Sequence, residues 1–148
     1  MNEETTTKNH AAESADARAE HILSLYRAHL ALEDGAETAS DGYDDYTSPD
    51  DIRERVQEEA LSVEVRAPWY SAGDEAPAPD EFAILITTGG PALRIRGELS
   101  ARMEPRRQWL ELQDWGTPWA QHIPAVDDRG EWSDALAWYV SNFYFGEG

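Results

Sequence analysis

Apolar residues recur at helical spacing in two stretches of the N-terminal half. The first stretch, residues 15–33, repeats large apolar side chains on one face, and Gly35 follows it as a typical helix-ending residue. The second helix is expected to begin at Ser48, a good N-cap, with Pro49 at the first helical position. Before the first helix, residues 1–14 are polar and acidic, which predicts a disordered acidic tail.

The middle of the chain changes to strand patterns. Residues 82–88 are a continuous apolar and β-branched run, typical of a buried strand. Residues 92–99 and 108–115 alternate apolar and polar side chains, as half-buried strands do. Short connections between these three segments predict an antiparallel meander. Residues 61–65 also alternate, so a fourth strand there is left open.

A last helical pattern covers residues 132–145, with Ser133 as the expected N-cap. The element order predicts an α+β fold, with two N-terminal helices and one C-terminal helix packed on a three- or four-stranded antiparallel meander. Because 148 residues fit one domain, we expect residues 15–148 to form a single α+β domain.

Charge and composition narrow the function classes. Thirty acidic and twelve basic residues give a formal net charge of -18, which disfavours direct binding to nucleic acid or to anionic membranes. The sequence has no cysteine and no apolar run of about 20 residues that could span a bilayer. With a polar N-terminus that does not resemble a signal peptide, we expect a cytoplasmic protein.

The sequence offers no convincing catalytic or metal-binding motif. His21 and His29 are eight residues apart, about two helical turns, which is too far for both to bind one metal. The Gly-Gly-Pro segment at residues 89–91 lies between two strands and has no following lysine, so a tight turn is favoured over a phosphate loop. We therefore predict no catalytic residues, no cofactor and no metal, and do not expect an enzyme.

Acidic residues concentrate in the first sixty positions, which hold sixteen acidic and five basic side chains. One interpretation is that the acidity only keeps the protein soluble, and the other is that a dense carboxylate surface imitates a nucleic-acid backbone. The second interpretation predicts a partner-binding acidic surface formed by Asp41, Asp44, Asp45, Asp50, Asp51, Glu54, Glu58 and Glu59.

An alternative contact surface lies in the strand region, where tryptophans and arginines gather. Tryptophan is used both in cores and at binding hot spots, so structural packing and partner contact both stay open for these residues. The predicted alternative surface consists of Trp109, Trp115, Trp119, Arg94 and Arg96.

The stretch EFAILITTGGPALRIRGEL, followed by WLELQDWGTPW, resembles a family of small acidic proteins carried on phages, plasmids and integrative elements of proteobacteria. The resemblance covers roughly residues 61–148 and includes an aromatic FGE run near the C-terminus. It implies no activity. The resemblance implies a genetic context: the family is encoded by accessory genes of mobile elements. Inhibitors of restriction or CRISPR systems are common among the products of such genes and are often acidic.

Two hypotheses for function follow. The first is a non-enzymatic accessory protein of a mobile element, acting as a DNA mimic that inhibits a host defence protein or another DNA-binding protein. The alternative is a module that binds a protein or a small ligand through the tryptophan and arginine face of its sheet. Both require a partner, and neither predicts an oligomeric state.

Overall fold

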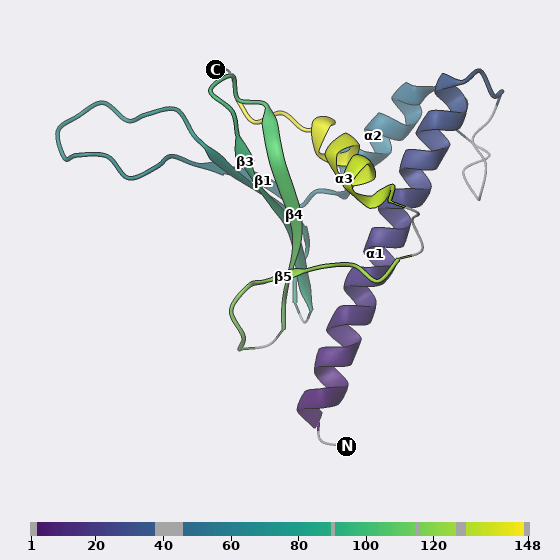
Figure 1. Cartoon of the computed structure of the whole chain (residues 1–148), viewed down its shortest axis with the longest axis horizontal. Helices are drawn as coiled ribbons and strands as arrows, with labels where there is room; N and C mark the ends of the chain where they lie inside the picture. The colour runs from purple at the N-terminus through teal and green to yellow at the C-terminus, as the bar shows by residue number, and fades with distance from the viewer. Residues whose placement is uncertain (1–2, 38–45, 90, 115, 127–129, 147–148) are drawn as a thin grey trace.

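In the computed structural model, helices cover one side of an antiparallel sheet (Figure 1). The structure describes residues 3–37, 46–89, 91–114, 116–126 and 130–146, with only the backbone described for residues 3–9. The elements in chain order are α1 (Glu3–Glu33), α2 (Pro49–Glu59), β1 (Ser62–Arg66), β2 (Glu81–Thr87), β3 (Ala92–Leu99), β4 (Pro105–Gln113), β5 (Ala120–His122) and α3 (Trp132–Ser141).

The strands form a meander in the order β1-β2-β3-β4-β5, with antiparallel neighbours throughout. The predicted α+β class and meander are confirmed, but the strand number is corrected from three or four to five within the described residues. β1 is the strand that the alternation over 61–65 left open. β5 is missing from the prediction because its three residues are too short to show an alternating pattern.

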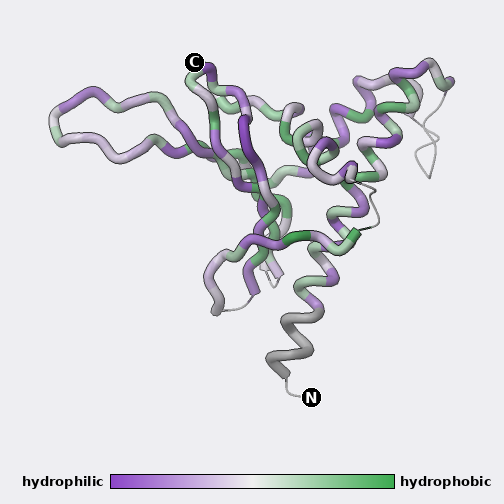
Figure 2. The backbone as a smooth tube through the Cα atoms, viewed as in Figure 1, coloured by the Kyte–Doolittle hydropathy of each residue, from purple (hydrophilic) through white to green (hydrophobic). Residues whose placement is uncertain are grey.

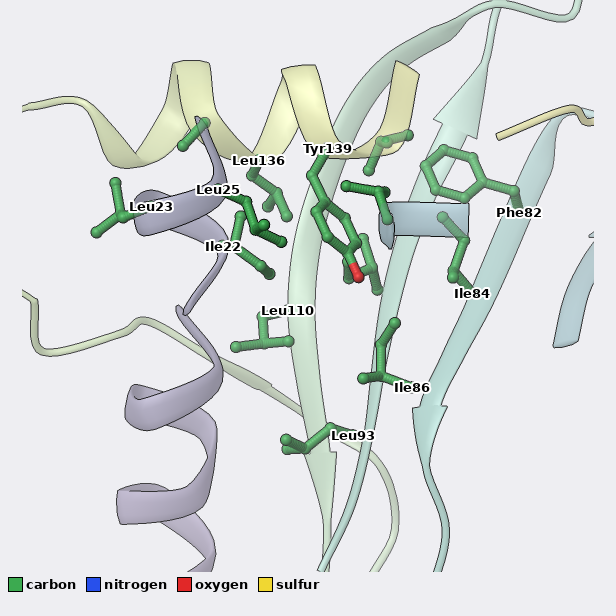
Figure 3. Close-up of a cluster of buried hydrophobic side chains, with 14 of the residues drawn as sticks. Ile22, Leu23, Leu25, Phe82, Ile84, Ile86, Leu93, Leu110, Leu136 and Tyr139 are labelled. Carbon is green, nitrogen blue, oxygen red and sulfur yellow. The ribbon is translucent and has the colours of Figure 1, made fainter. Parts of the chain in front are cut away.

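The strand alternation divides the sheet into a helix-covered face and a helix-free face. Phe82, Ile84 and Ile86 of β2 are buried under the helices, and Leu93 and Ile95 of β3 lie beside them. Figure 3 shows these side chains meeting residues of α1 and α3 in one cluster. Tyr139 of α3 is the largest of the fully buried side chains in this core, and its ring reaches from the helix toward the sheet (Figure 3).

α1 begins at Glu3, so the expectation of a disordered tail over residues 1–14 differs from the structure. Ala11 and Ala15 are buried, which shows that small residues continue the packed side of α1 ahead of its large apolar ones. Asp16 also accepts a hydrogen bond of 2.8 Å from Nε2 of His122 at the end of β5. The part of α1 ahead of residue 15 thus packs through small side chains such as Ala11, which give no strong hydrophobic period.

The two shorter helices begin differently. Ser48 caps α2 as predicted, and Asp51 completes a capping box by accepting hydrogen bonds at the N-cap. For α3 the prediction of Ser133 as N-cap is wrong, because Glu131 occupies that position without a side-chain cap. Trp132, the first residue of α3, packs against the core, so packing accounts for this start better than capping.

The β1–β2 connection, residues 67–80, projects from the sheet as a long arm (Figure 1). Figure 2 colours the arm mostly pale or purple, with few strongly hydrophobic positions. Trp69 and Tyr70 lie on the arm and are exposed. Within the part of the chain that the structure describes, no helix is long and apolar enough to cross a membrane.

Candidate functional site

The helix-free face of the sheet carries arginine and glutamate side chains that pair across strands. Glu81 of β2 receives Nη2 of Arg66 at 2.6 Å and Nη2 of Arg96 at 2.8 Å, one on each carboxylate oxygen. Two arginines on this side of the face therefore share one carboxylate.

The same face holds the tryptophans that the sequence singled out. Arg94 donates to Glu111 at 2.7 Å, and Nε1 of Trp109 donates to the other oxygen of Glu111 at 2.8 Å. The guanidinium carbon of Arg94 lies 4.1 Å from the ring centroid of Trp119, a cation–π distance. The fold thus brings four residues of the predicted alternative surface onto one face. The fifth, Trp115, lies outside the described residues.

The predicted acidic surface is divided by the fold. Asp50, Glu54 and Glu58 are exposed along α2. Their spacing of four residues places them in one row, about 6 Å apart along the helix axis. Three other predicted members, Asp41, Asp44 and Asp45, lie outside the described residues.

Asp51 has a structural role at the start of α2. Its Oδ2 accepts backbone hydrogen bonds from Thr47 at 2.9 Å and from Ser48 at 3.2 Å. These two bonds, in that order, lower the pKa of the Asp51 carboxyl, so it stays ionised at the positive end of the helix dipole.

Glu59 is not part of the exposed acidic surface, and this part of the prediction is wrong. Its side chain is only 8% exposed, at the C-terminal end of α2. His21 of α1 pairs with Oε2, Tyr139 donates to Oε1 at 2.8 Å, and Arg55 donates to Oε2 at 3.2 Å. A carboxylate in this position joins all three helices.

The electrostatics of this group keep Glu59 charged. Burial raises the pKa of Glu59, but hydrogen bonds from His21 and Tyr139 lower it more, and the net direction is below its ordinary value. Burial, followed by the charge of Glu59, raises the pKa of Tyr139 far above its ordinary value. Tyr139 therefore keeps its proton and remains a hydrogen-bond donor to the carboxylate.

A cavity of about 500 Å³ opens next to this group, between α1, α2 and the β2–β3 connection. Arg18, His21 and Arg55 line it, and each of the three is paired with Glu59. We call it the Arg18–Arg55 cavity. The sequence interpretation missed this cavity, because Arg18 and Arg55 are 37 residues apart in the chain and meet only when α1 and α2 pack.

One sequence signal did point to Glu59. Ile52 and Val56 define the buried stripe of α2, and Glu59 continues that stripe three residues later. A charged residue on an apolar stripe indicates either that the stripe ends there or that the charge has a buried partner. Here the partners are His21 and Tyr139.

Among the described residues, no group of three His, Cys, Asp or Glu side chains could hold a metal ion. Comparison with protein-family models, with curated proteins and with solved structures finds no match to the chain.

Proposed function

We propose that the protein is a non-enzymatic binding protein whose acidic helical end engages a cationic surface of a protein partner, in place of DNA phosphates. The observation that carries this proposal is the exposed row Asp50, Glu54 and Glu58 on α2. Figure 1 places α2 alongside the C-terminal half of α1, where Glu33 and Asp34 are also exposed. The carboxylates of two helices therefore contribute to one end of the molecule.

Local helix stability explains Asp50, which lies in the first turn of α2, but not the acids at the helix C-termini. The C-terminal end of a helix carries partial negative charge, so Glu33 at the end of α1 and Glu58 at the end of α2 are unfavourable there. The last turn of each helix contains no basic residue. Arg53, exposed on α2, offsets one charge of the row but leaves an excess of carboxylates. An excess of carboxylates that is retained although it destabilises the helix ends is what a binding surface for cations requires.

The partner of this proposal is a DNA-binding protein, because its nucleic-acid groove is the cationic surface most suited to a row of fixed carboxylates. The resemblance to proteins of mobile elements favours a host defence protein of the restriction or CRISPR type. Such a complex would form without direct contact between this protein and nucleic acid.

The double substitution Glu54→Lys/Glu58→Lys tests the proposal. Host proteins that bind DNA-cellulose would be incubated with the immobilised protein and then eluted with salt or with short duplex DNA. We expect duplex DNA to release the partner, and salt to weaken the complex because exposed charges are screened beyond about 8 Å at physiological ionic strength. The double variant should bind about tenfold more weakly or worse, since each reversal replaces attraction by like-charge contact.

The matched control is Asp74→Lys/Glu75→Lys, the same charge change on the projecting arm, on the other side of the sheet from α2 (Figure 1). It should leave binding close to that of the unmodified protein. Equal losses in both double variants would mean that only net charge matters. A partner that duplex DNA does not displace would contradict mimicry.

A second candidate function is supported by the tryptophan and arginine residues of the helix-free face. Because Arg94 and Arg96 are already paired with Glu111 and Glu81, a partner here would be an uncharged protein surface or small ligand packing on the indoles. Binding of that kind should survive high salt, unlike binding to the acidic row.

For this candidate we expect Trp119→Ala to weaken a salt-resistant complex by about tenfold or more while the unfolding midpoint changes little. The reason is that Trp119 is half-buried and packs on Arg94 outside the main core cluster. Binding and urea unfolding would be measured on the same samples. A large loss of stability in this variant would identify Trp119 as a structural residue and remove the support for this candidate.

A further inference from the structure

The Arg18–Arg55 cavity lies apart from the helix-free face, and it borders the exposed acidic row through Arg55, which also lines a second pocket with Glu54 and Glu58. α1 contributes Ser14, Arg18 and His21 to its lining, α2 contributes Arg55, and Thr87 comes from the end of β2. Its volume of about 500 Å³ lies within the range of small-molecule sites. Its lining combines the apolar residues Ala17, Pro91 and Leu93 with basic and hydroxyl side chains, in a molecule whose net charge is -18.

The positive charge here exceeds what Glu59 requires. The single buried carboxylate of Glu59 pairs with the guanidinium groups of Arg18 and Arg55, which always carry a charge, so two fixed positive charges meet one negative charge within this group. His21 adds to this surplus whenever it is protonated. The surplus faces the cavity, since all three basic side chains line it.

The guanidinium group of Arg18 has N–H donors that its pairing with Glu59 does not use. Its Nη1 lies 3.8 Å from Oε1 of Glu59, which is an ion-pair distance beyond hydrogen-bonding range. Within the described residues Glu59 is its paired acid, and the oxygen that it approaches already accepts a hydrogen bond from Tyr139 at 2.8 Å. Its guanidinium group is therefore held near the cavity by charge, with N–H groups available to a ligand.

Arg55 approaches from the other side. It donates through Nε to Oε2 of Glu59, whereas Arg18 approaches Oε1, so the two guanidinium groups flank one carboxylate from two helices. Glu59 fixes their positions because it is ionised and buried. Guanidinium groups placed on two sides of a cavity suit a tetrahedral oxyanion, which offers oxygens in several directions, better than a planar carboxylate.

We propose that the Arg18–Arg55 cavity binds a small molecule through a tetrahedral oxyanion such as a phosphate monoester, with Arg18 and Arg55 as the anion-binding residues. Ser14 lines the same cavity and carries a hydroxyl group, whereas the hydroxyl group of Thr87 is engaged with Pro91 and Leu93 in the β2–β3 connection. The inference is independent of the proposed partner surface, since neither arginine belongs to the exposed acidic row.

The test is titration calorimetry of the full chain with inorganic phosphate, phenyl phosphate and acetate at constant ionic strength. We expect saturable binding of phosphate, tighter binding of phenyl phosphate because the cavity is larger than the anion, and little binding of acetate. Arg18→Gln should weaken phosphate binding about tenfold or more, because charged hydrogen bonds of this kind contribute strongly.

The matched control is Arg53→Gln, which removes the same charge from an exposed position of α2 outside the cavity. It should bind phosphate as the unmodified chain does, and urea unfolding would verify that both variants are folded. Equal phosphate affinity in the two variants would overturn the assignment of the site. Absence of saturable binding to both phosphate compounds, or acetate binding as tight as that of phosphate, would overturn the ligand class.

Discussion

Replacing Gly97 by alanine is expected to lower the free energy of unfolding by about 3 kcal/mol or more. Gly97 lies in β3, on the helix-covered face, opposite Phe82 of β2. A Cβ at this position would come within 2.3 Å of the carbonyl oxygen of Arg107 and within 2.3 Å of Cζ of Phe82. The first of these is backbone of a paired strand, so it cannot move aside without disturbing the ladder between β3 and β4.

Urea unfolding followed by tryptophan fluorescence measures this loss. The Phe82 ring is also confined, because its centroid lies 4.6 Å from that of Phe145. A Phe82→Leu background would therefore separate the two contacts. Gly97→Ala should cost less there than in the unmodified chain, but some loss should remain from the backbone contact. A change within about 0.5 kcal/mol for the single substitution would contradict the close packing of Phe82 over Gly97.

The second large effect is expected for Glu59→Gln, which should destabilise the fold by about 2–3 kcal/mol at neutral pH. Breaking a buried ion pair typically costs about 3–5 kcal/mol, and partial exposure of Arg18 and Arg55 reduces that value here. Glutamine has nearly the same shape, so the loss reports the charge that holds His21 and the two arginines at the junction of α1, α2 and α3. The control Glu58→Gln changes the same charge at the exposed neighbour and should shift stability by less than about 0.5 kcal/mol.

The pH dependence of the Glu59 effect has a definite sign. Because the folded-state pKa of Glu59 lies below its ordinary value of 4.5, its stabilisation is fully present above that value. It is lost as the pH falls through the folded-state pKa. The difference in unfolding midpoint between the unmodified chain and Glu59→Gln should therefore be large near pH 7 and shrink as the pH falls below 4.5 and through the folded-state pKa. A difference that stays constant over this interval would show that packing, not charge, causes the loss.

The parts of the fold that could be predicted from the sequence are those with strong local signals. Ser48 and Pro49 marked the start of α2, and alternation assigned Leu93 and Ile95 to the buried face of β3. The start of α1, the N-cap of α3 and the end of α3, which lies at Ser141 and not at residue 145, were predicted incorrectly. The first depends on the packing of small side chains such as Ala11, and the second follows the packing of Trp132, which no local pattern encodes.

The candidate sites divide in the same way. A list of acidic positions cannot distinguish the exposed Glu58 from the buried Glu59, although the two are adjacent. Glu59 lies on the apolar stripe of α2 and Glu58 does not. Whether a carboxylate on that stripe is exposed or buried is decided by the residues of the other elements that pack against it. The cross-strand pairing of Arg94 with Glu111 likewise depends on the register between β3 and β4, which alternation alone does not specify.

The sequence by itself determined the α+β class, the meander, the cap of α2 and the net charge of -18, because periodicity, capping and composition act within one segment or over the whole chain. Only the tertiary structure decided which carboxylates face solvent, which tryptophans share the helix-free face, and that Arg18 and Arg55 line one cavity. The physical reason is that burial and pairing depend on residues far apart in the chain. Their distances are set by how helices pack on the sheet and not by their spacing in sequence.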